Sequence, residues 1–252
     1  MNSLRAQVLS AAVLVALWES ASSLQWVDPT LLPPFSAVCA TLWDMLQERQ
    51  FLAEVQVTLI EILVAFLIAA PVALACGFFL GEKPAWGAVF NPMIEFILAV
   101  PQSVFLPLFV LALGTGYAQK IVFGVTHAFF VIAVNTVAAV RTVPRSYVLL
   151  ARSCGATRWQ IYRRIYFPAM LPLVLTGLRL GMIFNITGIL LSEMFSSRHG
   201  LGQLLVSWGD AFQIRQLLAG IVLVALLTIA LNELMRVWEV RESRGQEAGI
   251  GA

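Results

Sequence analysis

The sequence predicts an all-α membrane protein with about six transmembrane helices. Hydrophobic residues make up 60% of the 252-residue chain. Only 12% of its residues are charged, about half of the roughly 25% that a soluble domain carries. Several apolar segments approach the roughly 20 residues that a helix needs to cross a bilayer. Since no stretch is polar enough for a separate soluble domain, we expect one membrane domain over residues 1–252.

Six segments reach or nearly reach the spanning length. They cover residues 6–24, 55–80, 96–113, 121–140, 172–195 and 216–238. The first segment has a second interpretation, because Arg5, the apolar run after it and the small residues that follow Glu19 are also typical of a secretory signal peptide. Its cleavage would leave five spans and an N-terminus outside the cell.

A short amphipathic helix is expected after the first span, over residues 36–50. Pro33 and Pro34 interrupt the chain there, and Ser36 suits the N-cap position. Four apolar residues fall on one side of this helix: Val38, Leu42, Met45 and Leu46. We therefore expect it to lie in the outer membrane interface.

Prolines mark the third span, where Pro101 and Pro107 remove backbone hydrogen bonds. Gln102 and Ser103 follow the first of them. A membrane tolerates the exposed carbonyls of a broken helix only against protein or water. Gln102 is therefore a candidate for lining a solute path.

The fifth span carries small residues on one side. At about 100° per residue, Gly177, Gly181, Gly188 and Ser192 lie within about 60° of one another, with Asn185 beside them. Such a surface allows either close packing of another helix or a narrow solute path. The candidate residues of a translocation path are Gln102, Ser103, Asn135, Gly181, Asn185, Gly188 and Ser192.

The polar segment between the fourth and fifth spans, residues 143–171, concentrates positive charge. Its arginines are Arg145, Arg152, Arg158, Arg163 and Arg164. With both termini in the cytoplasm, 12 of the 16 Lys and Arg residues fall on the cytoplasmic side and 4 outside. The positive-inside rule favours this topology.

The turn signals of this segment predict a helix–turn–helix. Ser146 suits the cap of a first helix through Cys154, and Gly155 suits the left-handed position that ends it. Thr157 suits the cap of a second helix, which Pro168 is expected to end near residue 167. One face of this second helix is aromatic: Trp159, Tyr162 and Tyr166.

Three roles remain open for this segment. It could anchor the topology, lie on anionic lipid headgroups, or insert its elbow into a groove of a partner protein. The first two roles leave the tight turn between two short helices unexplained.

The residues also resemble a known family. "ARSCGATRWQIYRRIYFPAMLPLVLTGLRLG" (residues 151–181) is similar to the signature loop of the inner-membrane permeases of bacterial ABC importers, in the nitrate/sulfonate/taurine-type branch. "LPPFSAV", "AVPQSVFLPLFVLALGTG" and "SEMFSSRHGLGQLL" resemble it too. One departure is clear: the family's Glu-Ala-Ala start falls on Leu149, Leu150 and Ala151, so the glutamate is missing.

This resemblance implies a type I ABC importer permease fold, in which residues 143–171 form a cytoplasmic coupling loop. The residues implied to contact the ATPase are Ala151, Arg152, Ser153, Cys154, Gly155, Ala156, Thr157 and Arg158. The implied partners are an ABC ATPase dimer, a second permease copy and a periplasmic or lipid-anchored solute-binding protein. The implied location is the bacterial inner membrane, and the implied solute is small and polar or anionic: nitrate-, sulfonate-, taurine- or thiamine-precursor-like.

ATP is expected on the partner, because this chain has no G-x-x-x-x-G-K-[ST] phosphate loop. We expect no catalytic site, since Ser196, His199 and Asp210 come without a G-x-S-x-G turn. An autonomous secondary transporter or channel is the alternative, and that class often shows ion sites or inverted repeats.

No metal or other cofactor is expected, because the two histidines and three cysteines are scattered along the chain. Nucleic acid is not an expected partner. Glu61 and Glu95 lie close to the ends of spans, and we expect both at the membrane interface. The alternative is a buried carboxylate, which inside a membrane is functional by default.

Overall fold

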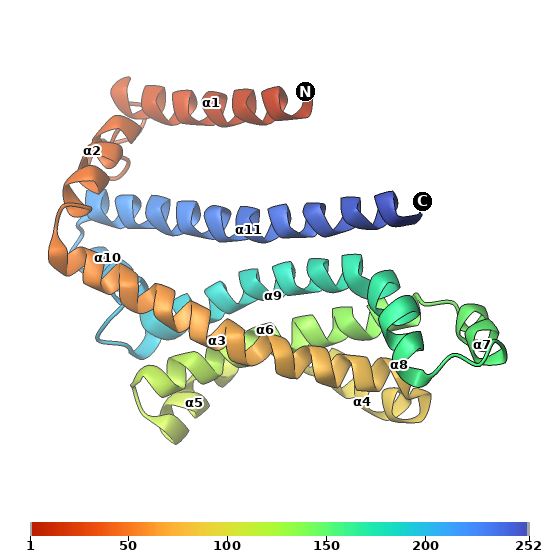
Figure 1. Cartoon of the computed structure of the whole chain (residues 1–252). Helices are drawn as coiled ribbons and strands as arrows, with labels where there is room; N and C mark the ends of the chain where they lie inside the picture. Colours follow the sequence, from red (N-terminus) through yellow and green to blue (C-terminus); the bar gives the residue numbers. More distant parts are fainter. Residues whose placement is uncertain (1, 251–252) are drawn as a thin grey trace. The chain divides into compact units, whose positions relative to one another are not determined.

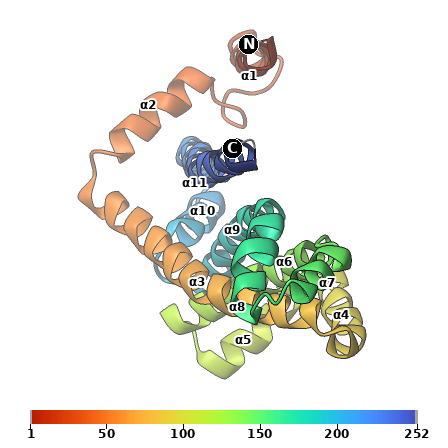
Figure 2. The same cartoon turned by 45° about the vertical axis from the view of Figure 1, so that its right-hand side comes forward.

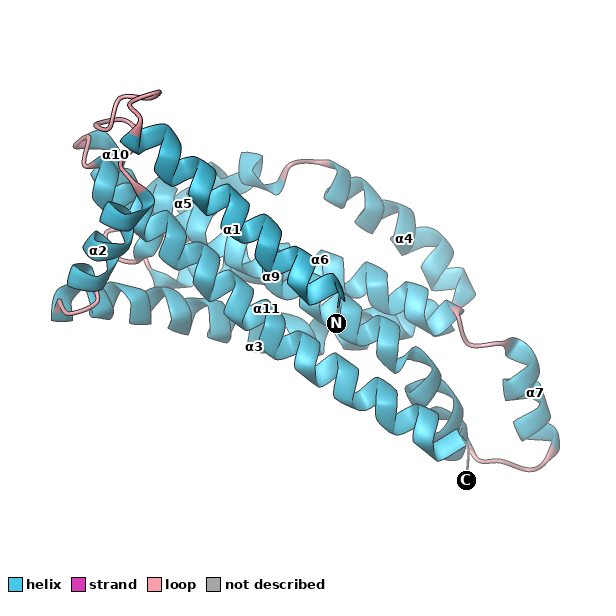
Figure 3. Ribbon diagram, turned by 90° about the horizontal axis from the view of Figure 1, so that it is seen from above, coloured by secondary structure: helices cyan, strands magenta, loops and turns pink. Residues whose placement is uncertain are grey.

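The computed structural model describes residues 2–250, with side chains described at residues 6, 9, 10 and 12–237. Within this part of the chain every regular element is a helix (Figures 1 and 3). The elements are α1 (Asn2–Ser23), α2 (Phe35–Met45), α3 (Arg49–Glu82), α4 (Pro84–Ala99), η1 (Gln102–Phe105), α5 (Leu106–Leu113), α6 (Tyr117–Arg141), α7 (Arg145–Ser153), α8 (Arg158–Ile161), η2 (Tyr162–Tyr166), α9 (Phe167–Ser196), α10 (Leu201–Asp210) and α11 (Ile214–Ile250).

Among the residues that the structure describes, four helical segments are long and apolar enough to cross a membrane. They are Arg49–Glu82, Tyr117–Arg141, Arg158–Ser196 and Ile214–Val237. A bent pair, Pro84–Ala99 with Gln102–Leu113, would make a fifth. α1 covers most of the predicted first span, but its apolar part is shorter, Ala12–Ser23.

The helices group into two compact units. One comprises Met1–Thr58 and Glu193–Leu227, and the other comprises Leu59–Ser192 and Thr228–Ala252.

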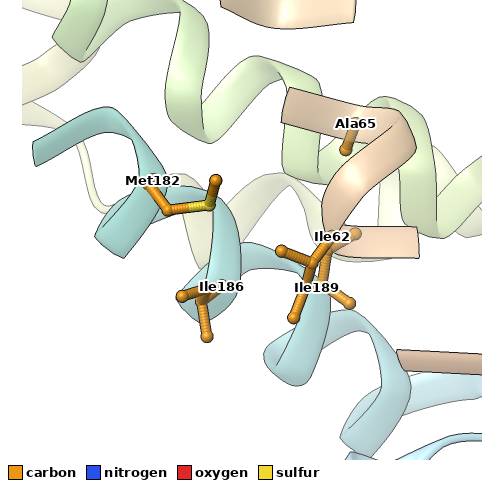
Figure 4. Close-up of a cluster of buried hydrophobic side chains, with 5 residues drawn as sticks. All are labelled: Ile62, Ala65, Met182, Ile186 and Ile189. Carbon is orange, nitrogen blue, oxygen red and sulfur yellow. The ribbon is translucent and has the colours of Figure 1, made fainter. Parts of the chain in front are cut away.

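The core of the second unit is built from α3, α6 and α9. One cluster joins Ile62 and Ala65 of α3 to Met182, Ile186 and Ile189 of α9 (Figure 4). A second cluster joins alanines of α3 to α6: Ala69, Ala73, Ala128, Ile132 and Ala133. Small side chains let these helix backbones approach closely, which is how helices in lipid gain packing contacts.

Glycines set the distance between α6 and α9. A Cβ atom added to Gly177 would lie 2.6 Å from Cβ of Asn135, and one added to Gly188 would lie 2.8 Å from Cγ of His127. A Cβ atom added to Gly181 would lie closer still to the Ile132 side chain. The small-residue stripe of the fifth span therefore packs against α6, one of its two predicted uses.

Replacing Gly181 by alanine should destabilise the protein, because the methyl group would overlap the Ile132 side chain. Overpacking of this kind costs about 1–3 kcal/mol, which thermal unfolding of the purified protein would measure. Gly209→Ala is the matched control, since nothing lies within 4 Å of that position, and it should be neutral or stabilising. Equal melting temperatures for the two variants would contradict the packing argument.

The predicted span over residues 96–113 is not one helix. α4 ends at Ala99, Val100 is extended as expected before a proline, and the chain turns by 85° into Gln102–Leu113. Pro107 does not break α5, because it lies in the first turn, where its missing N–H has no helical partner anyway.

The helix predicted over residues 36–50 is shorter than expected, since α2 ends at Met45 and α3 begins at Arg49. Of the four apolar residues predicted on one side, Val38, Leu42 and Met45 are buried, whereas Leu46 is exposed. Ser36 is not the N-cap. Pro34 occupies that position, and the Ser36 hydroxyl instead donates to Glu19 at 2.8 Å.

Candidate functional site

The candidate site is the connection between α6 and α9, in which α7 is joined to its neighbours by non-helical segments on both sides (Figure 3). α7 ends in a Schellman motif. The Ala156 N–H donates to the Ala151 carbonyl at 2.9 Å, and the Gly155 N–H donates to the Arg152 carbonyl at 2.9 Å. Gly155 has φ +77°, which confirms the predicted left-handed position.

α8 begins with a capping box. The Gln160 N–H donates to Thr157 Oγ1 at 3.3 Å, and the Thr157 N–H donates to Gln160 Oε1 at 2.8 Å. The predicted Thr157 cap is therefore confirmed. The predicted Ser146 cap is wrong, since Pro144 occupies the N-cap of α7 with no side-chain hydrogen bond.

The second helix does not end near residue 167. It continues from Arg158 to Ser196 through the π-helical turn Tyr162–Tyr166. In this turn the Phe167 N–H reaches the Tyr162 carbonyl, five residues back. The wider turn accommodates Pro168, which has no N–H to donate the hydrogen bond that a regular α-helix would make at that position.

Two residues of the predicted aromatic stripe attach this helix to α3, and the ribbons of α8 and the end of α3 lie close together in Figures 1 and 2. The rings of Tyr162 and Tyr166 lie 5.6 and 5.9 Å from the ring of Phe78, and the Tyr162 hydroxyl donates to Glu82 at 2.6 Å. Trp159 does not join them, because it is 70% exposed. The α8 end is thus fixed to a long apolar helix.

The predicted elbow is accessible. Arg152, Ser153, Cys154, Gly155, Thr157 and Arg158 are exposed, and Ala151 and Ala156 are half-buried. α7 also exposes three large side chains that a folded protein usually covers: Tyr147, Leu149 and Leu150. An apolar surface bordered by arginines fits a protein partner better than bulk water.

Four of the predicted path residues are buried together in α9: Gly181, Asn185, Gly188 and Ser192. The Asn185 amide donates to the Ile62 carbonyl at 2.7 Å, and the Ser192 hydroxyl donates to Gln119 at 3.0 Å. These contacts hold α3, α6 and α9 together.

The other three path residues lie apart from that cluster. Asn135 is half-buried and donates to the Val131 carbonyl at 2.8 Å. Gln102 and Ser103 lie just after the bend at Pro101, where Ser103 is exposed. Gln102 Oε1 is buried and has no hydrogen-bond partner within the described part of the chain. Their role in a path stays a prediction.

Sequence reasoning missed a buried ion pair between Glu61 of α3 and Lys120 of α6, whose side chains are 1% and 3% exposed. The interface position expected for Glu61 is wrong, because this carboxylate lies inside the protein. Glu61 interrupts an otherwise apolar run, which was the available signal. Nothing in the sequence indicated its partner 59 positions away.

The "SSRHGLGQ" turn between α9 and α10 is held by two carboxylates. Glu193 is fully buried and accepts from the Gly202 N–H and the Thr58 hydroxyl, both at 2.7 Å. Glu54 accepts from the Gly200 N–H at 2.6 Å and lies 3.2 Å from His199 Nδ1. The turn is therefore fixed to the first part of α3.

Thr58→Val should weaken this attachment. The Leu201 N–H donates to the Thr58 hydroxyl at 2.8 Å, and this hydroxyl donates to a Glu193 oxygen. Valine has no hydroxyl, so both groups would lose this partner. Each unsatisfied buried group costs about 1–3 kcal/mol, so we expect a lower unfolding temperature. The control Thr187→Val removes only an exposed bond to the helix backbone. An unfolding temperature lowered no further than in that control would refute the predicted role.

Within the described residues, no group of three or more His, Cys, Asp or Glu side chains could hold a metal ion.

The comparisons with known proteins agree with this arrangement. The profile of the family described as "Binding-protein-dependent transport system inner membrane component" matches residues 58–241. The taurine transport system permease protein TauC of Escherichia coli (strain K12) is 28% identical over 235 residues, which are 91% of this chain and 86% of that protein. The putative aliphatic sulfonates transport permease protein SsuC of Bacillus subtilis (strain 168) is 25% identical, over 92% of this chain and 84% of that protein.

A solved structure shares the fold. A chain of the MetNI methionine ABC transporter, in an inward-facing conformation, superposes with a TM-score of 0.55 at 19% identity and covers 85% of this chain and 98% of that chain. The family profile covers most of the sequence, and the fold agrees with it. The chain therefore belongs to the binding-protein-dependent transport system inner membrane component family and is a permease subunit of an ABC importer.

Proposed function

We propose that this permease imports a small sulfonate-type solute, anionic or zwitterionic, that a solute-binding protein delivers. ATP hydrolysis takes place on a partner ATPase dimer. Two permease copies form the pathway in the bacterial inner membrane, with both termini in the cytoplasm. The solute class rests on the names of the relatives, a taurine permease and a putative aliphatic sulfonate permease.

The α7–Gly155–α8 elbow is the observation that carries the proposal. It is an exposed, arginine-rich helix–turn–helix whose geometry is fixed by a Schellman motif and a capping box. A lipid anchor needs charge and apolar surface but not this defined turn. A partner protein that moves the permease through this elbow needs a rigid contact. Tyr162 and Tyr166 connect that contact to α3.

In the proposed mechanism, ATP closes the ATPase pair and draws the two elbows together. Each elbow transmits the motion to α9, because Arg158–Ser196 is one continuous helical segment. α6 follows α9, since glycine contacts hold the two helices in register. The pathway between the permease copies then changes the side of the membrane to which it opens.

Reconstitution tests the proposal. We expect vesicles that contain the permease and the ATPase, with the binding protein on the outside, to accumulate taurine or an alkanesulfonate only when ATP is present. Vesicles with the permease alone should accumulate none. Uptake by the permease alone would instead favour an autonomous transporter or channel.

A further inference from the structure

A polar cavity of about 700 Å³ lies within the unit that comprises Met1–Thr58 and Glu193–Leu227. Its walls are the end of α2, the start of α3, the turn before α10, α10 itself and the start of α11, which gather on the left in Figure 1. Small-molecule sites typically have volumes of about 300–1,000 Å³. The size of the cavity therefore suits a small solute.

Opposite charges line this cavity without pairing. Asp44 and Glu48 come from the end of α2 and the connection to α3, whereas Arg198 and Arg215 come from the turn before α10 and from the start of α11. Among the side chains that the structure describes, none of these four takes part in an ion pair. The third carboxylate, Glu54, is occupied by the Gly200 N–H and His199.

The rest of the lining adds neutral polar groups and an aromatic wall. Gln203, Gln213 and Gln216 supply amides that both donate and accept hydrogen bonds. Trp208 packs against buried Phe51, with ring centroids 6.2 Å apart. An aromatic ring in the same lining as two carboxylates can contribute to the binding of an ammonium group.

We propose that this cavity is a binding site of the permease for a small zwitterion. Its ammonium group would lie against Asp44 and Glu48, and its acid group against Arg198 and Arg215, whose guanidinium groups suit bidentate contact. A singly charged ion would satisfy one pair and leave the other unmatched, so the cavity discriminates by charge pattern. The inference rests on the proposed function, which puts the cavity on the outer side and suggests aminosulfonates as ligands.

The first test measures binding without the binding protein. The permease–ATPase complex in lipid nanodiscs would be titrated by calorimetry with taurine, with ethanesulfonate, which lacks the amine, and with ethylamine, which lacks the sulfonate. We expect taurine to bind at least about tenfold more tightly than either single ion. Ethanesulfonate binding as tightly as taurine, or no measurable taurine binding, would overturn the inference.

Variants then locate the site. Arg215→Gln and Asp44→Asn should each weaken taurine binding at least about fivefold, because each removes one charge of the matched pattern. Arg49→Gln is the control, since Arg49 is an exposed cation at the start of α3 that does not line the cavity. It should leave the affinity for taurine unchanged. An equal loss of taurine affinity in all three variants would indicate a general electrostatic effect and refute the proposed site.

A last measurement separates this inference from the proposed function. If the complex supports normal ATP-driven uptake but does not bind taurine in the absence of the binding protein, the proposed site is refuted and the importer function stands. Variants that keep their taurine affinity but lose affinity for the binding protein would identify the cavity as a protein contact, against the inference. Taurine binding to the complex without any ATP-driven uptake would support the site and count against the proposed transport function.

Discussion

Gly155→Val should strongly reduce ATP-driven uptake while the protein still inserts and folds. Gly155 has φ +77°, a left-handed conformation that costs an L-residue about 1–2 kcal/mol and that β-branched residues rarely adopt. The valine would open the Schellman motif and change the angle between α7 and α8. We expect uptake in reconstituted vesicles to fall at least about tenfold, the factor that 1.4 kcal/mol represents.

Gly155→Asn is the matched variant, because asparagine tolerates the left-handed region. Nothing lies within 4 Å of a Cβ atom at this position, so the isolated chain has room for the side chain. Retained uptake in Gly155→Asn with loss in Gly155→Val would show that backbone geometry matters. Loss in both would indicate that the partner fits tightly around the elbow, and full activity in Gly155→Val would refute the coupling role.

Lys120→Met should strongly destabilise the protein, because it leaves the Glu61 carboxylate buried without its cation. Breaking a buried ion pair from one side typically costs about 3–5 kcal/mol. The double variant Glu61→Met with Lys120→Met removes both charges and should recover most of the loss, since apolar replacements of such pairs are often neutral or stabilising. Unfolding of the purified protein by heat or denaturant gives the comparison.

Arg236→Met provides the control for that experiment. Arg236 pairs with Glu233 at 2.7 Å, but the two side chains are 56% and 44% exposed. An exposed pair contributes about 0–1 kcal/mol, so this variant should unfold almost as the wild type does. If Lys120→Met and Arg236→Met had equal effects, the Glu61–Lys120 pair would not be buried as the structure shows.

Local signals of the sequence predicted local structure well. The apolar segments lie in helices, and Gly155 and Thr157 have the conformations that their side chains favour. These predictions succeeded because each depends on a few neighbouring residues and on the length of helix that a bilayer requires. The capping prediction failed at Ser146, where a proline just before it takes the N-cap, and at Pro168, where a π turn accommodates the ring.

The sequence by itself therefore determined the class of protein, most of the helical segments and the turn at the elbow, since hydropathy, capping residues and glycine act over short distances. The tertiary structure alone decided which helices meet. It placed the stripe from Gly177 to Gly188 against α6, joined Glu61 to Lys120, and gathered Asp44, Glu48, Arg198 and Arg215 around one cavity. Such contacts join residues far apart in the chain, and a buried carboxylate gives no indication in its own neighbourhood of which distant cation will neutralise it.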